Sequence, residues 1–412
     1  MSVTTVPKKG YKSVPWLFGK EIEIPEEWEL KKIKDIAKVS VGLVINPSTY
    51  FDKNGTIPMI TGKNVTEKGI VLDDIDLITE ESNEFLESTR IWDGDLVTMR
   101  VGYPGRTCLV KKEHDGINCA SVIITRKNKT YQSQFFHYLT NSKLTTQQIT
   151  KYTAGGARQV VNINSWKEFL ITYPPLPEQQ QIASILSNVD NLIQNTDKLI
   201  EKTTRLKKGL MQKLLTRGIG HAKFKKVKWY FGKEIEIPQE WEVVKFRSMI
   251  KMEYGTGLTE EKRDNFGNPV YGSGGLIGLH SKPIVNGPGI IVARKGSLGN
   301  VFLENNDFFP IDTVYYITEK QTEIDLKFLF YYLLFMKLEN LRIVTSKPGI
   351  SREDVYSYRI LSIPFEEQQK IASILSNTDE KIQSYEQYKE KLQRLKKSLI
   401  QKLLTGEVRV AV

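Results

Sequence analysis

The segment Glu178-Gln-Gln-Gln-Ile-Ala-Ser-Ile-Leu-Ser-Asn-Val-Asp190 decides the fold, because it returns as Glu367-Gln-Gln-Lys-Ile-Ala-Ser-Ile-Leu-Ser-Asn-Thr-Asp379. A second segment, Phe18-Gly-Lys-Glu-Ile-Glu-Ile-Pro-Glu-Glu-Trp-Glu29, returns as Phe231-Gly-Lys-Glu-Ile-Glu-Ile-Pro-Gln-Glu-Trp-Glu242. The 412-residue chain is therefore two copies of one unit, each with an opening segment, a variable body and a helix. A period this long indicates a domain duplication, not a solenoid array.

The distance between matching residues changes along the chain and locates an insertion. The opening segments are 213 residues apart, the later halves of the bodies 194 and the helices 189. The first body is therefore 19 residues longer, and the extra residues precede Arg100, the match of Arg294. Each body mixes short β-rich runs with one aromatic-rich helical stretch. We expect two mixed α/β bodies with one fold and two different surfaces.

The region after Pro177 changes to the pattern of a long helix. Nine positions spaced alternately by three and four residues form a heptad seam, typical of a coiled coil. They are Ile182, Ile185, Val189, Leu192, Thr196, Leu199, Thr203, Leu206 and Leu210. The second helix repeats this seam in weaker form, with Lys381, Tyr385 and Tyr388 among its positions. A helix of roughly 38–40 residues, at about 1.5 Å per residue, would span about 60 Å.

The connection between the copies indicates how the helices run. Roughly 14 residues follow the first helix and reach at most about 50 Å, too little to return along the rod. We therefore expect an antiparallel two-helix coiled coil with one body at each end. The alternative is a pair of unrelated core helices, which the preserved register disfavours.

Composition points to a polyanionic partner. The formal net charge is +11, from 59 Lys and Arg against 48 Asp and Glu, and this points to a polyanion, most often nucleic acid, although charge alone fits a solvated Lys-rich surface equally well. The two cysteines, Cys108 and Cys119, lie in alternating apolar runs and are expected to be buried thiols. No apolar run is long enough to span a bilayer, so a cytoplasmic protein is expected.

The chain lacks the motifs of the relevant enzymes. We find no phosphate-binding loop, and Tyr173-Pro-Pro175 lacks the leading Asn or Asp of the amino-methyltransferase tetrapeptide. The four histidines are scattered, without metal-ligand spacing. These absences favour a non-catalytic protein with neither a metal nor a cofactor of its own.

Glycine-rich turns that carry cations are the candidate nucleic-acid contacts. Arg100-Val-Gly-Tyr-Pro-Gly-Arg106 and Arg294-Lys-Gly-Ser-Leu-Gly-Asn300 each follow a predicted strand, where glycine permits close backbone approach and arginine can fork onto a base edge. The alternative is that these are tight turns with surface ion pairs. The candidate DNA-binding residues are Lys63, Asn64, Arg100, Tyr103, Arg106, Arg158, Tyr271, Ser273, Arg294, Lys295, Ser297, Lys347 and Arg352.

These features together resemble the specificity (S) subunits of type I restriction–modification systems, over nearly the whole chain. The marks are Pro174-Pro-Leu-Pro-Glu-Gln-Gln180, Ile363-Pro-Phe-Glu-Glu-Gln-Gln369, the repeated Ile-Pro-x-x-Trp, Ala293-Arg-Lys-Gly-Ser297 and Pro269-Val-Tyr-Gly-Ser-Gly-Gly275. The first body departs from the pattern, with Met99-Arg-Val-Gly102 in place of Ala-Arg-Lys-Gly. The resemblance implies two target recognition domains, each reading half of a bipartite DNA site, with the helices as a spacer.

The resemblance also sets the expected fold class, an α+β protein. It consists of two globular target recognition domains of mixed α/β type, joined by two long antiparallel coiled-coil helices with pseudo-twofold internal duplication. The expected boundaries are an N-terminal segment 1–27, recognition domain 28–176, spacer helix 177–217, linker and repeated segment 218–240, recognition domain 241–364, spacer helix 365–405 and C-terminal tail 406–412.

The resemblance implies partners that carry out the chemistry. The helices would dock two modification (methyltransferase) subunits, and restriction subunits that translocate and cleave DNA would complete the complex. S-adenosylmethionine, ATP and Mg would then be bound by those partners, while this chain binds double-stranded DNA and no membrane. Two other functions stay open: a self-sufficient DNA methyltransferase or nuclease, and a sequence-blind coiled-coil DNA adaptor.

Overall fold

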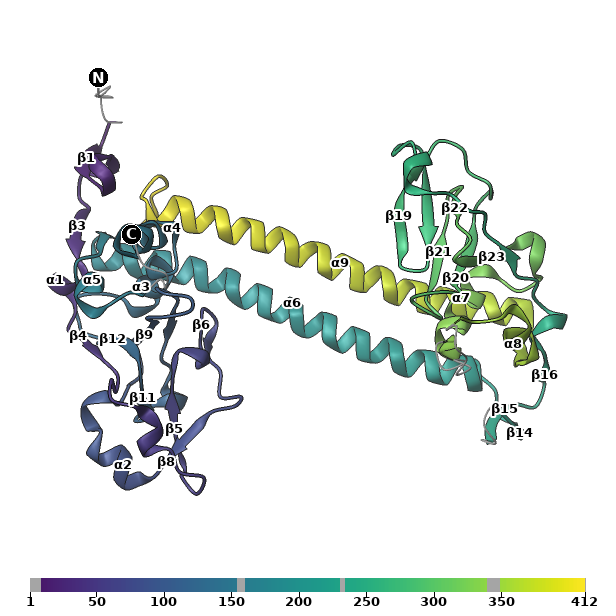
Figure 1. Cartoon of the computed structure of the whole chain (residues 1–412), viewed down its shortest axis with the longest axis horizontal. Coiled ribbons are helices and arrows are strands. Elements are labelled where there is room, and N and C mark those ends of the chain that lie inside the picture. Colours follow the sequence, from purple (N-terminus) through teal and green to yellow (C-terminus); the bar gives the residue numbers. More distant parts are fainter. Residues whose placement is uncertain (1–8, 154–159, 230–233, 339–348, 412) are drawn as a thin grey trace. The chain divides into compact units, whose positions relative to one another are not determined.

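The computed structural model describes residues 9–153, 160–229, 234–338 and 349–411 (Figure 1). The chain divides into two compact units. Unit 1 comprises residues 1–195 and 389–412, and unit 2 comprises residues 196–388. Both long helices therefore contribute one end to each unit.

Unit 1 is built on an antiparallel four-stranded sheet with the order β10-β9-β12-β4. A three-stranded sheet of order β11-β5-β8 follows, with β11 parallel to β5. Two-stranded pairs β1-β2, β3-β13 and β6-β7 complete the unit. The strands are β1 Tyr11–Pro15, β2 Glu21–Pro25, β3 Glu29–Lys32, β4 Val39–Val41, β5 Ile57–Ile60, β6 Val65–Thr66, β7 Gly69–Ile70, β8 Asp76–Ile78, β9 Leu96–Met99, β10 Thr107–Leu109, β11 Asn118–Cys119, β12 Val122–Thr125 and β13 Leu170–Tyr173.

Unit 2 repeats this topology sheet by sheet. Its four-stranded sheet has the order β21-β20-β23-β17 and its three-stranded sheet the order β22-β18-β19, again with one parallel pair, β22 and β18. Its two-stranded pairs are β14-β15 and β16-β24. The strands are β14 Phe224–Lys228, β15 Glu234–Pro238, β16 Glu242–Lys245, β17 Glu253–Tyr254, β18 Asn268–Gly272, β19 Gly275–His280, β20 Gly289–Ala293, β21 Val301–Glu304, β22 Phe309–Pro310, β23 Val314–Thr318 and β24 Arg359–Ser362.

The insertion in the first body forms extra structure between two strands of the small sheet. In unit 1 the β6-β7 hairpin lies between β5 and β8, whereas in unit 2 two residues, Ser273 and Gly274, join the equivalent strands β18 and β19. The predicted duplication with divergent early halves is confirmed.

Short helices cover the sheets and close each core. They are α1 Ile33–Ile36, α2 Glu80–Phe85, α3 Ser133–Thr140, α4 Lys143–Thr153 and α5 Ile163–Lys167 in unit 1, and α7 Leu326–Met336 and α8 Arg352–Ser357 in unit 2. The aromatic-rich stretches predicted to be helical are α3 and α7, and both are mostly buried because their aromatic residues recur on nearly every face. Phe135 and Phe136 of α3 pack in one cluster with Ile182 of the first long helix.

The two long helices are α6, Leu176–Arg217, and α9, Phe365–Leu404, with 42 and 40 residues. They run antiparallel within each unit, as predicted, because the end of one packs beside the start of the other. In unit 1 Lys396 lies 2.6 Å from Asp190, and in unit 2 Lys207 lies 2.6 Å from Asp379. Tyr138 and Tyr331 donate to the same two carboxylates at 2.7 and 2.8 Å.

The predicted heptad seam of α6 has two alternating sets of positions, and the prediction that the second set is buried is wrong. Ile182, Val189 and Thr196 are buried, but Leu199 and Leu206 are exposed by 43% and 57%. The first turns of α6 pack against the body of unit 1. From there a straight helix of 3.6 residues per turn drifts away from a strict seven-residue repeat. The apolar residues at the alternate positions therefore face away from the buried side of the helix.

The repeated tryptophan and glutamate meet inside each unit. In unit 1, Trp28 Nε1 donates to Glu178 Oε2 at 2.8 Å. Arg409, which follows α9, donates through Nε to Glu178 Oε1 at 2.8 Å. Gly406 permits this return of the chain, because it has a φ of +74° and an added Cβ would lie 2.4 Å from Pro25.

Unit 2 uses the same arrangement with a different cation. Trp241 Nε1 donates to Glu367 Oε2 at 3.0 Å, and His221, which follows α6, lies 2.8 Å from Glu367 Oε1. His221 and Arg409 occupy matching places, three residues after Gly218 and Gly406. We call each tryptophan, glutamate and cation set a clasp.

The neighbouring glutamine of each repeat also has an internal role. Gln179 Oε1 accepts from the backbone nitrogen of Gln132, the residue before α3, at 2.9 Å. Gln368 Oε1 accepts from the backbone nitrogen of Asp325, the residue before α7, at the same distance. The repeated Glu-Gln pair thus ties the start of each long helix to its own body.

Candidate nucleic-acid interface

The two predicted arginine turns adopt one conformation. Each links two antiparallel strands, β9 to β10 and β20 to β21. Gly102, Gly105, Gly296 and Gly299 all have positive φ, between +70° and +84°. The turn closes when Gly105 N donates to Met99 O at 2.9 Å, and Gly299 N donates likewise to Ala293 O at 3.1 Å. The glycines are therefore required by the turn.

In unit 2 the turn places Arg294 among tyrosine rings. Its guanidinium carbon lies 4.9 Å from the centre of the Tyr254 ring and 5.3 Å from that of Tyr315. Its Nη1 donates to the backbone oxygen of Asp312 at 3.0 Å. These contacts hold the guanidinium in one orientation at the end of the sheet.

The structure brings Arg352 to the same place. Arg352 begins α8, and its guanidinium carbon also lies 4.9 Å from the Tyr254 ring centre. Its Nη1 donates to the backbone oxygen of Met252 at 3.2 Å. Tyr254 was missed by the sequence reasoning, because the alternation Lys251-Met252-Glu253-Tyr254 indicates a strand but not that this strand lies beside the two arginines.

Tyr315 supports the same cluster from below. Burial, followed by the hydrogen bond to Tyr254, raises the pKa of Tyr315 to about 12, while the Arg294 charge opposes the shift. The Tyr315 phenol donates to the backbone oxygen of Ile350 at 3.1 Å. It is therefore a structural residue that remains neutral.

The matching turn of unit 1 presents a different surface. Tyr103 is 63% exposed, and the Arg106 guanidinium lies 4.0 Å from its ring centre. Arg100 is half-buried, and its backbone oxygen accepts from Val161 at 2.9 Å. The exposed Tyr103 ring and the half-buried Arg106 together form a cation-and-ring surface suited to DNA.

Asn64 is not available to a ligand, which corrects the prediction for this residue. It is 1% exposed, Oδ1 accepts from Thr61 N and Nδ2 donates to Val71 O, both at 3.0 Å. These hydrogen bonds hold the turn before β6, so the side-chain oxygen and nitrogen of Asn64 both already have partners within the chain. The adjacent Lys63 is exposed and lies 3.2 Å from Asp76, and the hydrogen bond to this carboxylate raises the pKa of Lys63.

The remaining candidates of unit 2 differ in availability. Tyr271 donates to Glu304 at 2.8 Å, and burial, assisted by that carboxylate, raises its pKa to about 12. Lys295 is exposed and lies 3.6 Å from Asp312, and Ser297 is exposed. Ser273 is half-buried, and its backbone nitrogen donates to Thr313 at 3.3 Å. Arg158 and Lys347 lie outside the described residues.

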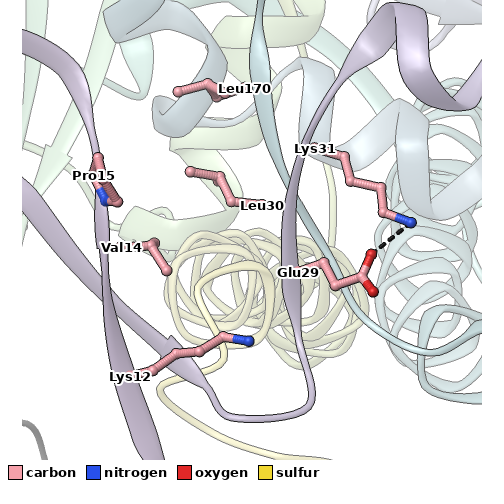
Figure 2. Close-up of a pocket in the computed structure, with 7 residues that line it drawn as sticks. All are labelled: Lys12, Val14, Pro15, Glu29, Leu30, Lys31 and Leu170. Atoms are coloured by element: carbon pink, nitrogen blue, oxygen red, sulfur yellow. Dashed lines mark ion pairs between the residues drawn. The ribbon is translucent and has the colours of Figure 1, made fainter.

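A surface cleft of about 550 Å³ lies elsewhere in unit 1, between β1 and β3 (Figure 2). The Lys31–Glu29 ion pair, 2.5 Å long, lines one wall. The lining residues are Lys12, Val14, Pro15, Glu29, Leu30, Lys31 and Leu170, none of which is a predicted DNA contact. The described parts of the chain contain no cluster of His, Cys, Asp and Glu that could hold a metal ion. They also contain no helix long and apolar enough to cross a membrane.

Comparison with known proteins agrees over the same two halves. The model of the type I restriction modification DNA specificity domain matches residues 25–205 and again 238–394. The type I restriction enzyme MjaVIII specificity subunit of Methanocaldococcus jannaschii is 29% identical, covering 94% of this chain and 95% of that protein. The crystal structure of a type I restriction–modification S subunit from M. genitalium superposes with a TM-score of 0.60 at 18% identity, covering 92% of this chain and 96% of that one. A structure described as showing complex assembly and conformational transition of the type I R-M system gives 0.57 at 16% identity, covering 93% and 99%.

Proposed function

Because the chain belongs to the type I restriction–modification DNA specificity family, we propose that it is the DNA-reading subunit of such a system. Each of its two bodies reads one half of a bipartite site in double-stranded DNA, in the cytoplasm. Specificity subunits are non-catalytic, so methyl transfer and cleavage are carried out by partner subunits.

The observation that carries this proposal is the repetition of one topology around different connections. The four-stranded sheets of the two units agree strand by strand, while the β5–β8 connection carries a hairpin where the β18–β19 connection has two residues. A constant framework with variable connections is how proteins place different binding residues on one scaffold. Two different half-sites follow from two different surfaces.

Charge supports the choice of DNA as the ligand. The net charge of +11 favours a polyanion, and the Arg106–Tyr103 pair and the Arg294 cluster supply cations beside aromatic rings. Arginine beside an exposed ring suits both phosphate and base contacts. Lys63, Lys295 and Ser297 remain candidate contacts because they are exposed polar residues of the two bodies.

The exposed apolar residues of the long helices are the proposed docking surfaces for modification subunits. Leu199 and Leu206 of α6 match Tyr388 and Leu395 of α9 at the 189-residue offset, and all four are between 43% and 57% exposed. Exposed apolar residues at matching positions of the two helices suit two copies of one partner. S-adenosylmethionine, ATP and Mg belong to the modification and restriction subunits in this proposal.

Docking of the modification subunits is tested by changing one of these exposed apolar residues. Leu206→Glu places a charge in the proposed interface and is expected to abolish co-purification of one modification subunit out of two. The control is Lys208→Glu, an exposed position on α6 about 200° around the helix from Leu206. Retention of both partners by the Leu206 variant would show that they bind elsewhere.

The DNA-reading function is tested by sequencing methylated DNA from cells that express the chain with its modification subunit. We expect a bipartite motif with a fixed gap, and replacing residues 28–176 by another recognition domain should change one half only. A change in both halves or in neither would contradict the modular assignment.

Two further measurements separate the other functions. Methyl transfer by the purified chain alone would identify a self-sufficient enzyme, and binding without any enriched sequence would identify a sequence-blind adaptor. Deleting residues 197–203 together with 386–392 removes one heptad from each helix, about 10 Å, and should shorten the gap by about three base pairs. An unchanged gap would show that the helices do not set the spacing.

A further inference from the structure

Two arginines in unit 2 share one exposed aromatic ring. The guanidinium carbons of Arg294 and Arg352 each lie 4.9 Å from the centre of the Tyr254 ring, so they are separated by at most twice that distance. Tyr254 is 46% exposed, so the shared ring lies at the surface. The chain brings these residues together from three elements: β17, the turn after β20 and the start of α8.

The two positive charges have no acidic partner. Among the described residues, neither guanidinium has a carboxylate within the 4.0 Å that defines an ion pair, and the partner of each Nη1 is a neutral backbone oxygen. Two like charges near one ring repel each other, although the ring quadrupole offsets part of this cost. An anion that contacts both guanidiniums would offset the repulsion, so the arrangement favours a negative ligand.

The orientation of the guanidiniums favours a phosphate over a base edge. The Nε atom of each arginine is buried without a hydrogen-bond partner, so the side-on fork of Nε and Nη2 is closed to a ligand. Each arginine therefore offers its outer end. Two arginines at one ring can donate to different oxygens of a single phosphate, whereas one guanine edge accepts one planar fork and would leave the second arginine unpaired.

On the described strands of unit 1, no aromatic ring occupies the position that matches Tyr254. Tyr254 pairs with Tyr315 across the sheet of unit 2, and the equivalent pair in unit 1 is Val41 with Ile123. Arg100, the match of Arg294, therefore has no ring from that strand on which to stack. The difference lies in the sheet framework, outside the variable connections that carry the proposed base contacts.

We infer that Tyr254, Arg294 and Arg352 bind one backbone phosphate of double-stranded DNA, and that unit 1 has no such site on its matching strands. The inference rests on the proposed DNA-binding function and deepens it. The site contributes affinity and positions unit 2 on its half-site, but it does not select bases. The two half-sites are accordingly bound with unequal dependence on salt.

The test measures duplex DNA binding by the reconstituted complex as a function of salt concentration. The double variant Arg294→Gln/Arg352→Gln should weaken binding about equally for target and non-target duplexes and lower the salt slope by about 0.9. Each single variant should lower the slope by less, because the other arginine still contacts the same phosphate. Arg359→Gln, an exposed arginine on β24 of the same unit, is the matched control and should leave the slope nearly unchanged.

Conservative variants distinguish the phosphate from a base. Arg352→Lys keeps a point charge, so it should retain the slope if the ligand is a phosphate. Tyr254→Val introduces the residue of unit 1 and should weaken binding severalfold without changing the methylated motif. Thermal unfolding of each variant identifies any that fails to fold, and the lysine variant then decides the question.

A methylphosphonate scan of the unit 2 half-site gives an independent result. One neutralised phosphate should weaken binding by the wild-type complex and have little effect on the double arginine variant. An unchanged salt slope in the glutamine variants, or a relaxed base preference at one position, would overturn the inference. Failure of the wild-type complex to prefer any sequence would instead overturn the proposed function.

Discussion

The clasp of unit 1 predicts that the C-terminal tail stabilises the N-terminal body. Arg409→Met removes the guanidinium but keeps the apolar stem, so the carboxylate of Glu178, which is 2% exposed, loses its cation. Breaking a buried ion pair costs about 3–5 kcal/mol, and we reduce this to about 2 kcal/mol because Arg409 itself is 38% exposed. For a unit of about 200 residues this lowers the melting temperature by about 4–8 °C.

Local hydrogen exchange is the assay that assigns this loss to unit 1. Peptides covering residues 171–195 and 399–411 should exchange faster in the variant, while peptides from unit 2 provide the internal reference. Arg205→Met, which removes an exposed ion pair with Glu201, is the matched control and should cost less than about 0.5 kcal/mol.

A double variant tests the physical reason. Glu178→Gln keeps an oxygen that accepts from Trp28 but removes the stranded charge. Combined with Arg409→Met it should therefore recover at least half of the lost stability. If the double variant were as unstable as the two single effects added together, the argument from a stranded buried carboxylate would be refuted.

Three further predictions concern unit 1. Burial raises the pKa of Cys108 to about 12 and also raises that of Cys119, so at pH 8 the folded chain should not react with a thiol reagent, and both thiols should react in denaturant. Gly105→Ala should destabilise unit 1 by roughly 1–2 kcal/mol more than Gly102→Ala in urea unfolding, because both have positive φ but only the Gly105 Cβ would lie 2.1 Å from a neighbouring side-chain atom. Asn64→Ala should cost about 2 kcal/mol of stability through two lost hydrogen bonds and leave the methylated motif unchanged; an altered motif would show that Asn64 contacts DNA.

The long helices show where periodicity was informative and where it failed. The existence and bounds of α6 and α9 followed from their continuous helical pattern and flanking prolines and glycines. The buried face of each helix could not be predicted in this way, because its apolar residues can pack either on the body of the unit or on the other long helix. Leu199 and Leu206 satisfy the heptad rule in sequence but lie exposed, since a spacing pattern does not say which neighbour covers which face.

The candidate interface divides in the same way. The positive-φ glycines of the two turns, and the arginine that precedes them, were readable, because only glycine adopts that backbone without strain. Tyr254 and the burial of Asn64 were not, because both depend on strands and turns that meet only in the folded unit.

The sequence by itself determined the duplication, the antiparallel helices and the family, because repeats and spacing are properties of the chain. Tertiary structure decided what the repeated residues do: Glu178 and Glu367, which open the repeated segments in the sequence, are partners of Trp28 and Trp241 in two clasps. The reason is that Glu178 and Trp28 are 150 residues apart along the chain, and only folding brings a donor and an acceptor so far apart within hydrogen-bonding distance.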